Sequence, residues 1–225
     1  MTTVAFFDVD GTLTKVHVWQ AFMAYFKTHG RRLWVHRFYW LWHMAQYPFF
    51  KMGWMSETAF RRKWAGHLAW YVRGMSVDEA QAIWEWVVKE YLPPHWRASS
   101  VARLQGHLQK GDVVVLVSAA PEPLIQRVAH HLGTPHAVAT RLEVRDGRYT
   151  GRAVPPVCIG PAKPQRAFEY LQAQGIVVAP EASWAYADAI SDLELLTSVG
   201  HPVAVAPEPD LASLARERGW EILPE

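Results

Sequence analysis

Two short runs of consecutive apolar residues constrain the fold of this chain more than any other feature. One lies within residues 3–9, and the other, Val-Val-Val-Leu-Val, occupies residues 113–117. Short runs rich in β-branched residues are typical of parallel strands that helices cover on both faces. Apolar residues with a helical period precede and follow the second run, so the sequence predicts an α/β sheet with right-handed crossover connections.

Shorter segments supply the rest of the predicted strands. Residues 182–187 and 202–206 have the composition of strands, and a short helical pattern lies between them. Residues 142–151 predict a β-hairpin, because the central Asp146-Gly147 is typical of its tight turn.

The composition changes within residues 17–98. This segment holds 10 of the 12 tryptophans, and it carries 11 lysines and arginines against 5 aspartates and glutamates, whereas the rest of the chain is net acidic. Such a shift indicates a module inserted into a host domain. The predicted domains are therefore a catalytic core of residues 1–16 and 99–225 and an inserted cap of residues 17–98.

The insert is predicted to be a small helical bundle. Ser76 and Glu79 have the spacing of a capping box, and a stretch of helical period follows them. Ser56 is a plausible first residue of another helix. The tryptophans are expected to form, for the most part, the core of this bundle.

Cysteine content and apolar run lengths bear on location. Cys158 is the only cysteine, which excludes an intramolecular disulfide and suggests a cytoplasmic protein. Asp8 and Asp10 interrupt the N-terminal apolar run, so a secretory signal is not expected. The uncharged aromatic stretch 38–50 has 13 residues, whereas a membrane-spanning helix needs about 20. No transmembrane segment is therefore predicted, and contact with a membrane surface stays open.

Polar residues follow the predicted strands or open the next helix. Ligands of open α/β sheets bind beyond the carboxyl ends of the strands, so these side chains are expected to meet at one rim. They are Asp8, Asp10, Ser118, Lys163, Asp188 and Asp192.

The charge of this group predicts a bound cation. Two like charges about 4 Å apart repel by roughly 4 kcal/mol at an effective dielectric constant of about 20. Four carboxylates therefore need more than one lysine beside them. Oxygen ligands suit Mg²⁺, and a dication with a lysine is a setting that phosphoryl chemistry uses.

Four motifs in this order resemble those of the haloacid dehalogenase superfamily. They are FFDVDGTLT, VLVSAAPE, Lys163 and YADAISDLELL, and the resemblance extends over residues 4–209. The helical insert and the hairpin EVRDGRYTG resemble the branch of phosphoserine and histidinol-phosphate phosphatases. The resemblance implies a Rossmann-like parallel sheet flanked by helices, an all-helical cap and a Mg²⁺-dependent phosphatase.

The resemblance also implies a role for each motif residue. Asp8 would be the nucleophile that forms a phosphoaspartyl intermediate, and Asp10 would protonate the leaving oxygen and then activate water. Ser118 would donate to a phosphoryl oxygen, and Lys163 would neutralise developing charge. The implied metal-binding residues are Asp8, Asp10, Asp188 and Asp192.

Two departures from the family pattern concern the metal and the substrate. The fourth motif has Ala187-Asp188-Ala189 where Gly-Asp-Ser is frequent, which removes one hydroxyl near the metal. Phosphoserine phosphatases usually have a glutamate nine residues after the nucleophile, and this chain has His17 there. The substrate therefore stays open within the branch.

The insert supplies the candidate substrate contacts. Arg61 and Arg62 belong to its densest basic cluster and are expected, with His17, to bind a phosphorylated substrate; the alternative for the arginines is a solvated helix face. The insert itself is expected to cover the rim as a lid.

The sequence leaves two classes of function open. The first is a phosphatase of a small phosphomonoester, with a phosphoserine- or histidinol-phosphate-like metabolite or a lipid-like phosphate as substrate. The second is a protein whose basic, tryptophan-rich insert binds a membrane surface or a partner. Nucleic acid is not expected as a partner, because no recognised binding fold appears and the net charge is only +2. The oligomeric state is left open.

Overall fold

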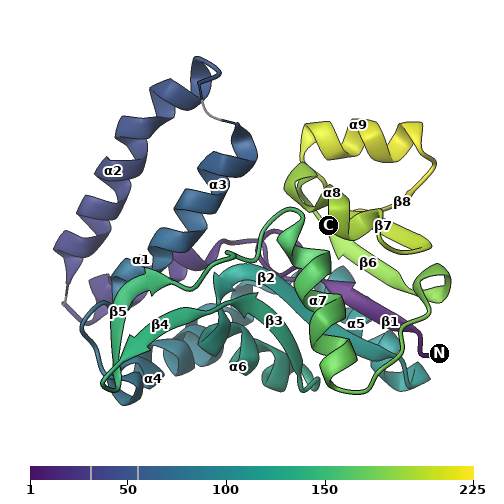
Figure 1. Cartoon of the computed structure of the whole chain (residues 1–225), viewed down its shortest axis with the longest axis horizontal. Helices are drawn as coiled ribbons and strands as arrows, with labels where there is room; N and C mark the ends of the chain where they lie inside the picture. The colour runs from purple at the N-terminus through teal and green to yellow at the C-terminus, as the bar shows by residue number, and fades with distance from the viewer. Residues whose placement is uncertain (31, 55) are drawn as a thin grey trace.

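A six-stranded parallel sheet forms the centre of the molecule (Figure 1). The structure is a computed structural model and describes residues 1–30, 32–54 and 56–225. The strand order is β3-β2-β1-β6-β7-β8, and every neighbouring pair is parallel. The strands are β1 (Val4–Phe7), β2 (Val113–Pro121), β3 (His136–Thr140), β6 (Trp184–Ala187), β7 (His201–Val205) and β8 (Glu221–Leu223). The predicted α/β fold class is confirmed.

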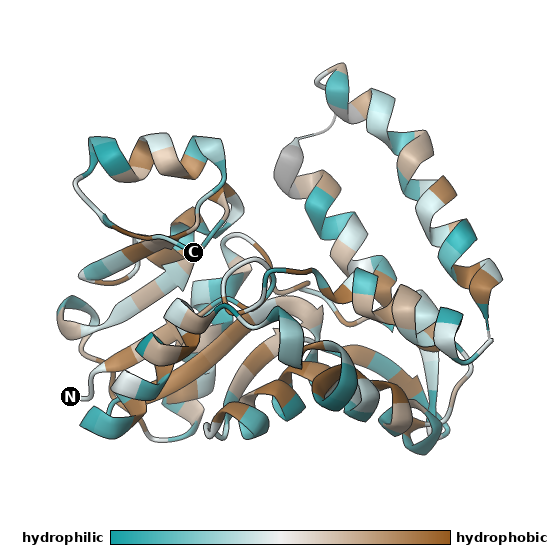
Figure 2. Ribbon diagram, turned by 180° about the vertical axis from the view of Figure 1, so that it is seen from behind, coloured by the Kyte–Doolittle hydropathy of each residue, from teal (hydrophilic) through white to brown (hydrophobic). Residues whose placement is uncertain are grey.

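Helices cover both faces of this sheet, which explains why the central strands are apolar throughout. On one face Ala5 and Phe7 of β1 pack with Leu104 and Leu124, and on the other Val4 and Phe6 share a second cluster with the remaining helices. Figure 2 shows the central strands as mostly hydrophobic. The helices of the first face are α5 (Ala98–Lys110) and α6 (Glu122–Leu132), and those of the second are α7 (Ala162–Ala173), α8 (Leu193–Leu196) and α9 (Pro209–Glu217). Short 3₁₀ turns are η4 (Pro180–Ala182) and η5 (Ile190–Asp192).

The segment between β1 and β2 is helical up to α5, as its periodicity predicts. It contains α1 (Val18–Thr28), α2 (Leu33–Lys51), α3 (Glu57–Gly66), η1 (His67–Val72), α4 (Val77–Trp86), η2 (Val87–Tyr91) and η3 (Pro93–His95). The capping box is present, since Ser76 N donates to Glu79 Oε2 at 2.6 Å and Glu79 N to Ser76 Oγ at 3.0 Å. Ser56 Oγ accepts from Ala59 N and caps α3.

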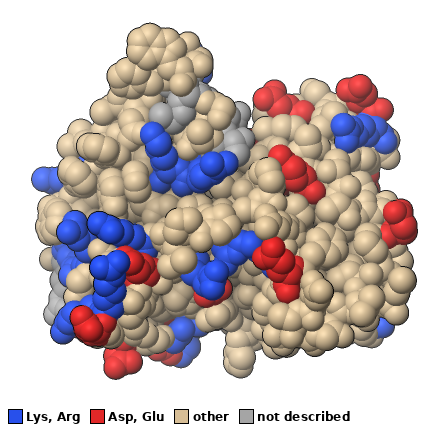
Figure 3. Space-filling model, viewed as in Figure 1, with Lys and Arg blue, Asp and Glu red and all other residues tan. Residues whose placement is uncertain are grey.

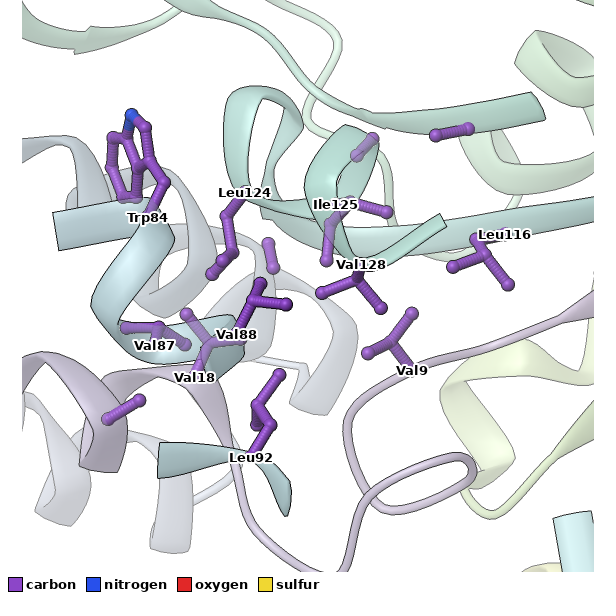
Figure 4. Packing of buried hydrophobic residues seen from close by; sticks show 14 of the residues in the cluster. Val9, Val18, Trp84, Val87, Val88, Leu92, Leu116, Leu124, Ile125 and Val128 are labelled. Atoms are coloured by element: carbon purple, nitrogen blue, oxygen red, sulfur yellow. The ribbon is translucent and has the colours of Figure 1, made fainter. Parts of the chain in front are cut away.

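The insert and the sheet share one apolar core. Figure 4 shows Val18, Val87 and Leu92 of the insert packed with Leu124 and Val128 of α6. This continuous contact holds the two ends of the insert, α1 and the segment around η2, in a fixed position against the core. The domain boundaries at residues 16 and 99 stay predictions, since this packing does not separate two cores.

The predicted hairpin is present and extends the insert rather than the sheet. Its strands are β4 (Leu142–Arg145) and β5 (Arg148–Ala153), and the turn residues Asp146 and Gly147 both have positive φ angles, 49° and 73°. Gly74 N donates to Tyr149 O at 2.7 Å and Tyr149 N to Met75 O at 2.9 Å. These bonds attach the hairpin to the segment between η1 and α4.

Most tryptophans of the insert belong to its core, as expected, but four do not. Trp84 is fully buried, and Trp19, Trp64, Trp70, Trp86 and Trp96 pack against the same core, whereas Trp34, Trp40, Trp42 and Trp54 are exposed. The reason is that α2 and α3 form a long hairpin that projects from the molecule, and α2 has protein on only one side (Figures 1 and 2). No helix among the described residues is both long and apolar enough to cross a membrane.

Candidate active site

The loop after β1 brings two aspartates to the carboxyl edge of the sheet. Asp8 follows the last residue of the strand, and its backbone N–H donates to Tyr186 O of the neighbouring strand at 3.0 Å. The side chain of Asp8 is almost fully buried. Asp10 lies two residues further on, and its Oδ1 accepts from Val18 N at the start of α1 at 3.2 Å. The backbone of Asp8 is therefore fixed by β6, and the carboxylate of Asp10 by the start of α1.

Lys163 joins two of the carboxylates. Its Nζ lies 2.6 Å from Asp8 Oδ1 and 2.7 Å from Asp192 Oδ1, and all three side chains are buried. Burial alone lowers the pKa of Lys163, but the adjacent Asp192 and Asp8 outweigh it and raise this pKa above its usual range. Lys163 is therefore a fixed positive charge.

The carboxylate of Asp188 can lie close to those of Asp8 and Asp192 because Gly11 has no side chain. Thr12 Oγ1 donates to Asp188 Oδ1 at 2.9 Å. Gly11 has φ +89°, and a Cβ there would lie 2.1 Å from Asp188 Oδ2. Glycine is thus required twice at this position, for its backbone angle and for the close approach of the carboxylate.

Replacing Gly11 by alanine is expected to disrupt the site beyond the cost of the backbone angle. The control is Gly175→Ala, where φ is +72° and nothing lies within 4 Å of the added Cβ. Both variants should lose about 1–3 kcal/mol of stability from the left-handed backbone. Only Gly11→Ala should lose catalytic activity, by at least about tenfold, because Asp188 must move. Equal activity of the two variants would contradict this role of Gly11.

Three carboxylates are close enough to share one cation. Ligand oxygens of Asp8, Asp188 and Asp192 lie within 4.8 Å of one another. Burial, with the neighbouring carboxylates, raises the pKa of Asp188 well above its ordinary value, and burial raises that of Asp192 to about 6. This donor set of hard oxygens with excess negative charge fits a divalent ion such as Mg²⁺. The three residues are among the four predicted as metal-binding.

Asp10 stands apart from this trio. Burial raises its pKa to about 8, and the nearby negative charge of Asp8 adds to the effect. The geometry thus does not place the Asp10 side chain with the other three predicted metal ligands, and its raised pKa suits a proton donor near neutral pH.

Ser118 lies where β2 leaves regular pairing. It is buried, and its Oγ accepts from Ala120 N at 3.1 Å. The pairing of β2 with β3 shifts between Ser118 and Pro121, and β2 continues to Pro121 before α6 begins. Ser118 therefore does not cap α6, and it lines the same pocket as the aspartates.

The pocket above these residues has a volume of about 350 Å³. The sheet supplies its polar floor, with Asp8, Asp10, Ser118, Lys163, Asp188 and Asp192 among the lining residues. The insert supplies a largely apolar wall, made by Trp19, Phe60, Trp64, Ala65 and Leu68. The sequence indicated the floor, whereas the wall had no local signal beyond the abundance of aromatic residues.

Two of the three residues predicted to contact the substrate lie at the pocket, and the third does not. His17 and Arg61 line the pocket, but Arg62 does not and is exposed. Adjacent residues of a helix point about 100° apart, so only one of the two arginines can face the pocket. Contact of Arg62 with a substrate therefore has no basis in the geometry.

Arg61 has a partner that the sequence did not indicate. Its Nη2 donates to both carboxylate oxygens of Glu208, at 3.0 and 2.9 Å. Glu208 precedes α9, and its backbone N–H donates to Asp188 O at 2.8 Å. This ion pair links the insert to the core beside the site. No sequence signal identifies it, because the two residues are 147 positions apart.

Comparisons with known proteins agree with this arrangement. Residues 5–197 match the haloacid dehalogenase-like hydrolases. The chain is 33% identical over 229 residues to the phosphoserine phosphatase SerB1 of Mycobacterium tuberculosis, covering 99% of this chain and 70% of that protein. It is 28% identical to a histidinol-phosphatase of Neisseria meningitidis, covering 99% of each. A solved structure from Bordetella pertussis Tohama I, of a protein with unknown function, has a TM-score of 0.80 and 29% identity, covering 99% of each chain.

The match includes the loop after β1, Lys163 and the aspartates after β6, which are the residues that meet at the floor of the pocket. Two curated relatives that align over nearly the whole chain, the phosphoserine phosphatase and the histidinol-phosphatase, are phosphatases by name. The chain therefore belongs to the haloacid dehalogenase-like hydrolase family and is a phosphatase, a phosphoric monoester hydrolase.

Proposed function

We propose that the protein hydrolyses a small phosphomonoester with Mg²⁺ through a phosphoaspartyl intermediate on Asp8. One observation carries this proposal: Asp8 lies 2.6 Å from the ammonium group of Lys163 and belongs to a trio of carboxylates with Asp188 and Asp192. A carboxylate attacks a phosphate dianion only if positive charge offsets their repulsion. Lys163 supplies part of that charge in this structure.

The metal would be held by Asp8, Asp188 and Asp192, and when bound it would supply the remaining positive charge around the phosphoryl group. Asp8 attacks phosphorus, the bond from phosphorus to the ester oxygen breaks, and Asp10 gives its proton to the leaving alkoxide. Asp10 then takes a proton from water, which attacks the same phosphorus and releases phosphate and free Asp8. Ser118 holds a phosphoryl oxygen throughout.

An Asp10→Asn variant tests the acid role. With p-nitrophenyl phosphate, whose leaving group needs little protonation, the loss of rate should be at least about tenfold smaller than with an alkyl phosphate. The raised pKa of Asp10, about 8, is the physical basis for this acid. Equal losses for both leaving groups would argue against protonation by Asp10.

The wall of the pocket supports a substrate with a ring or an apolar part. Trp19, Phe60 and Trp64 surround the space above the floor. Burial lowers the pKa of His17, so this residue is neutral near pH 7. It therefore supplies no negative charge to a substrate's amino group. Phosphoserine and histidinol phosphate both carry an amino group, so the aromatic wall, which suits a ring, is the feature that favours a histidinol-phosphate-like ester. The same wall would also accept the apolar part of a lipid-like phosphate.

A substrate panel with and without metal tests the proposal. Histidinol phosphate, phosphoserine, glycerol phosphates and lysophosphatidate would each be assayed for phosphate release with Mg²⁺, after EDTA treatment and after Mg²⁺ is restored. We expect activity that EDTA abolishes and Mg²⁺ restores, and a higher kcat/KM for histidinol phosphate than for phosphoserine. Full activity in EDTA would refute metal dependence, and a preference for phosphoserine would refute the substrate assignment.

We also propose that the protein is located in the cytoplasm, because this reducing compartment keeps a free thiol reduced. Cys158 is free and fully buried, and burial raises its pKa to about 11. Expression as a fluorescent fusion, followed by fractionation, would test this assignment.

A further inference from the structure

The hairpin of α2 and α3, residues 33–66 and here called the aromatic hairpin, projects away from the sheet (Figures 1 and 2). Among the described residues, thirteen large hydrophobic side chains are exposed, and ten of them lie within residues 33–54. Trp54 is 74% exposed, Trp34 69% and Leu41 65%. Exposed apolar side chains scattered singly are ordinary, but a concentration of this kind on one projecting element indicates an interaction surface.

One stripe of α2 is buried by packing within the chain. Val35, Tyr39 and His43 recur every four residues and are buried. Tyr39 and His43 contact Trp64 of α3, with ring centroids 5.4 and 4.6 Å apart. The helix is thus fixed to its neighbour along this stripe.

The opposite side of α2 is apolar and faces outward. Trp34, Phe38 and Leu41 follow one another at spacings of four and three residues, which places them on a single face of the helix. All three are exposed. Met52 and Trp54 continue the exposed apolar surface beyond the end of α2. The hairpin therefore has an inner face that holds it in place and an outer face that is largely exposed, although Phe38 also contacts Trp70, with ring centroids 5.4 Å apart.

The charge of this region indicates what covers the outer face. Between Asp10 and Asp78 the sequence contains a single acidic residue, Glu57. The exposed basic side chains of the same region include Arg37, Lys51, Arg62 and Lys63. On the face shown in Figure 3, the projecting lobe carries lysine and arginine and no acidic side chain among its described residues. A second copy of the chain would bring like charges together, whereas an anionic surface is complementary.

We propose that the aromatic hairpin binds the surface of an anionic lipid bilayer. Tryptophan and basic side chains together are typical of elements that lie at the headgroup level, where the rings enter the acyl boundary and the cations meet lipid phosphates. Trp34, Leu41 and Trp54 enter the boundary, and Arg37 and Lys51 stay among the headgroups. This peripheral contact is independent of the reaction at Asp8 and does not require a lipid substrate.

Vesicle flotation tests the proposal with the full chain. The vesicles consist of phosphatidylcholine alone or with phosphatidylglycerol, at low and high salt. One variant, Trp34→Ser/Leu41→Ser/Trp54→Ser, removes apolar contacts, and its control is Val144→Ser/Val177→Ser, which changes exposed apolar residues outside the hairpin. A second variant, Arg37→Glu/Lys51→Glu, reverses charge, and its control is Lys110→Glu/Arg216→Glu, two exposed basic residues elsewhere.

The wild type should float with the phosphatidylglycerol vesicles, and high salt should weaken this binding. The charge reversal should lower the partition coefficient by more than about tenfold and the apolar variant by more than about a hundredfold, with the controls unchanged. All variants should keep the same rate with soluble p-nitrophenyl phosphate, so loss of binding is distinct from failure of the enzyme. Absence of salt-sensitive flotation, or a dimer in size-exclusion chromatography that the apolar variant dissociates, would overturn the proposal.

Discussion

Replacing Asp8 by asparagine is expected to reduce phosphatase turnover by more than about a thousandfold while the chain stays folded. Asparagine has nearly the same shape, but its neutral amide is no nucleophile towards phosphorus. The change also removes the negative charge that Lys163 Nζ contacts at 2.6 Å, and one of the three carboxylates of the trio. The loss should therefore appear in kcat with every phosphomonoester.

Steady-state rates measure the loss of turnover, and thermal unfolding measures whether the variant stays folded. The control is Asp210→Asn, which changes an exposed aspartate at the start of α9. Its kcat should equal that of the wild type, and the two variants should have similar circular dichroism spectra. If Asp8→Asn kept more than a few per cent of the wild-type rate, Asp8 would not be the nucleophile.

Replacing Lys163 by methionine is expected to damage both stability and activity. The ammonium group lies between Asp8 and Asp192, and all three side chains are buried. Removing one partner of a buried ion pair leaves uncompensated charge and typically costs about 3–5 kcal/mol. The free energy of unfolding should fall by this amount at neutral pH, and turnover should fall with it because the charge beside Asp8 is lost.

Urea unfolding gives the stability, and Lys110→Met, at the exposed end of α5, is the matched control. Added Mg²⁺ should restore part of the lost stability, since a dication bound by the carboxylates offsets some of the same repulsion. A Lys163→Met variant as stable as the control would contradict the electrostatic role of this residue.

The strands show where prediction from sequence succeeds. β1 and the first five residues of β2 are unbroken apolar runs because helices cover both faces, and such runs are visible without any structure. β3, His-Ala-Val-Ala-Thr, and β8, with three residues at the sheet edge, were not predicted. Their residues have weak strand preference, and only pairing with β2 and β7 makes them strands.

In the insert, the sequence predicts the helices but not which of their side chains are buried. Its helices follow from periodicity and from the capping box at Ser76, which are local signals. The exposure of Trp34 and Trp54 does not follow from local signals, because burial depends on which elements pack around a helix. Composition indicated a core for these tryptophans, and the projecting hairpin left them outside it.

The sequence by itself determined the chemistry of the candidate site. Asp8, Asp10, Lys163 and Asp188 are recognisable because each follows a strand or opens a helix, and motif and strand pattern are properties of neighbouring residues. Tertiary structure alone decided the distances and the walls. Asp8 and Lys163 are 155 positions apart yet 2.6 Å from each other, and Arg61 faces the pocket while Arg62 faces solvent. Such contacts depend on how whole elements pack, and no local pattern encodes the angle at which α3 meets the sheet.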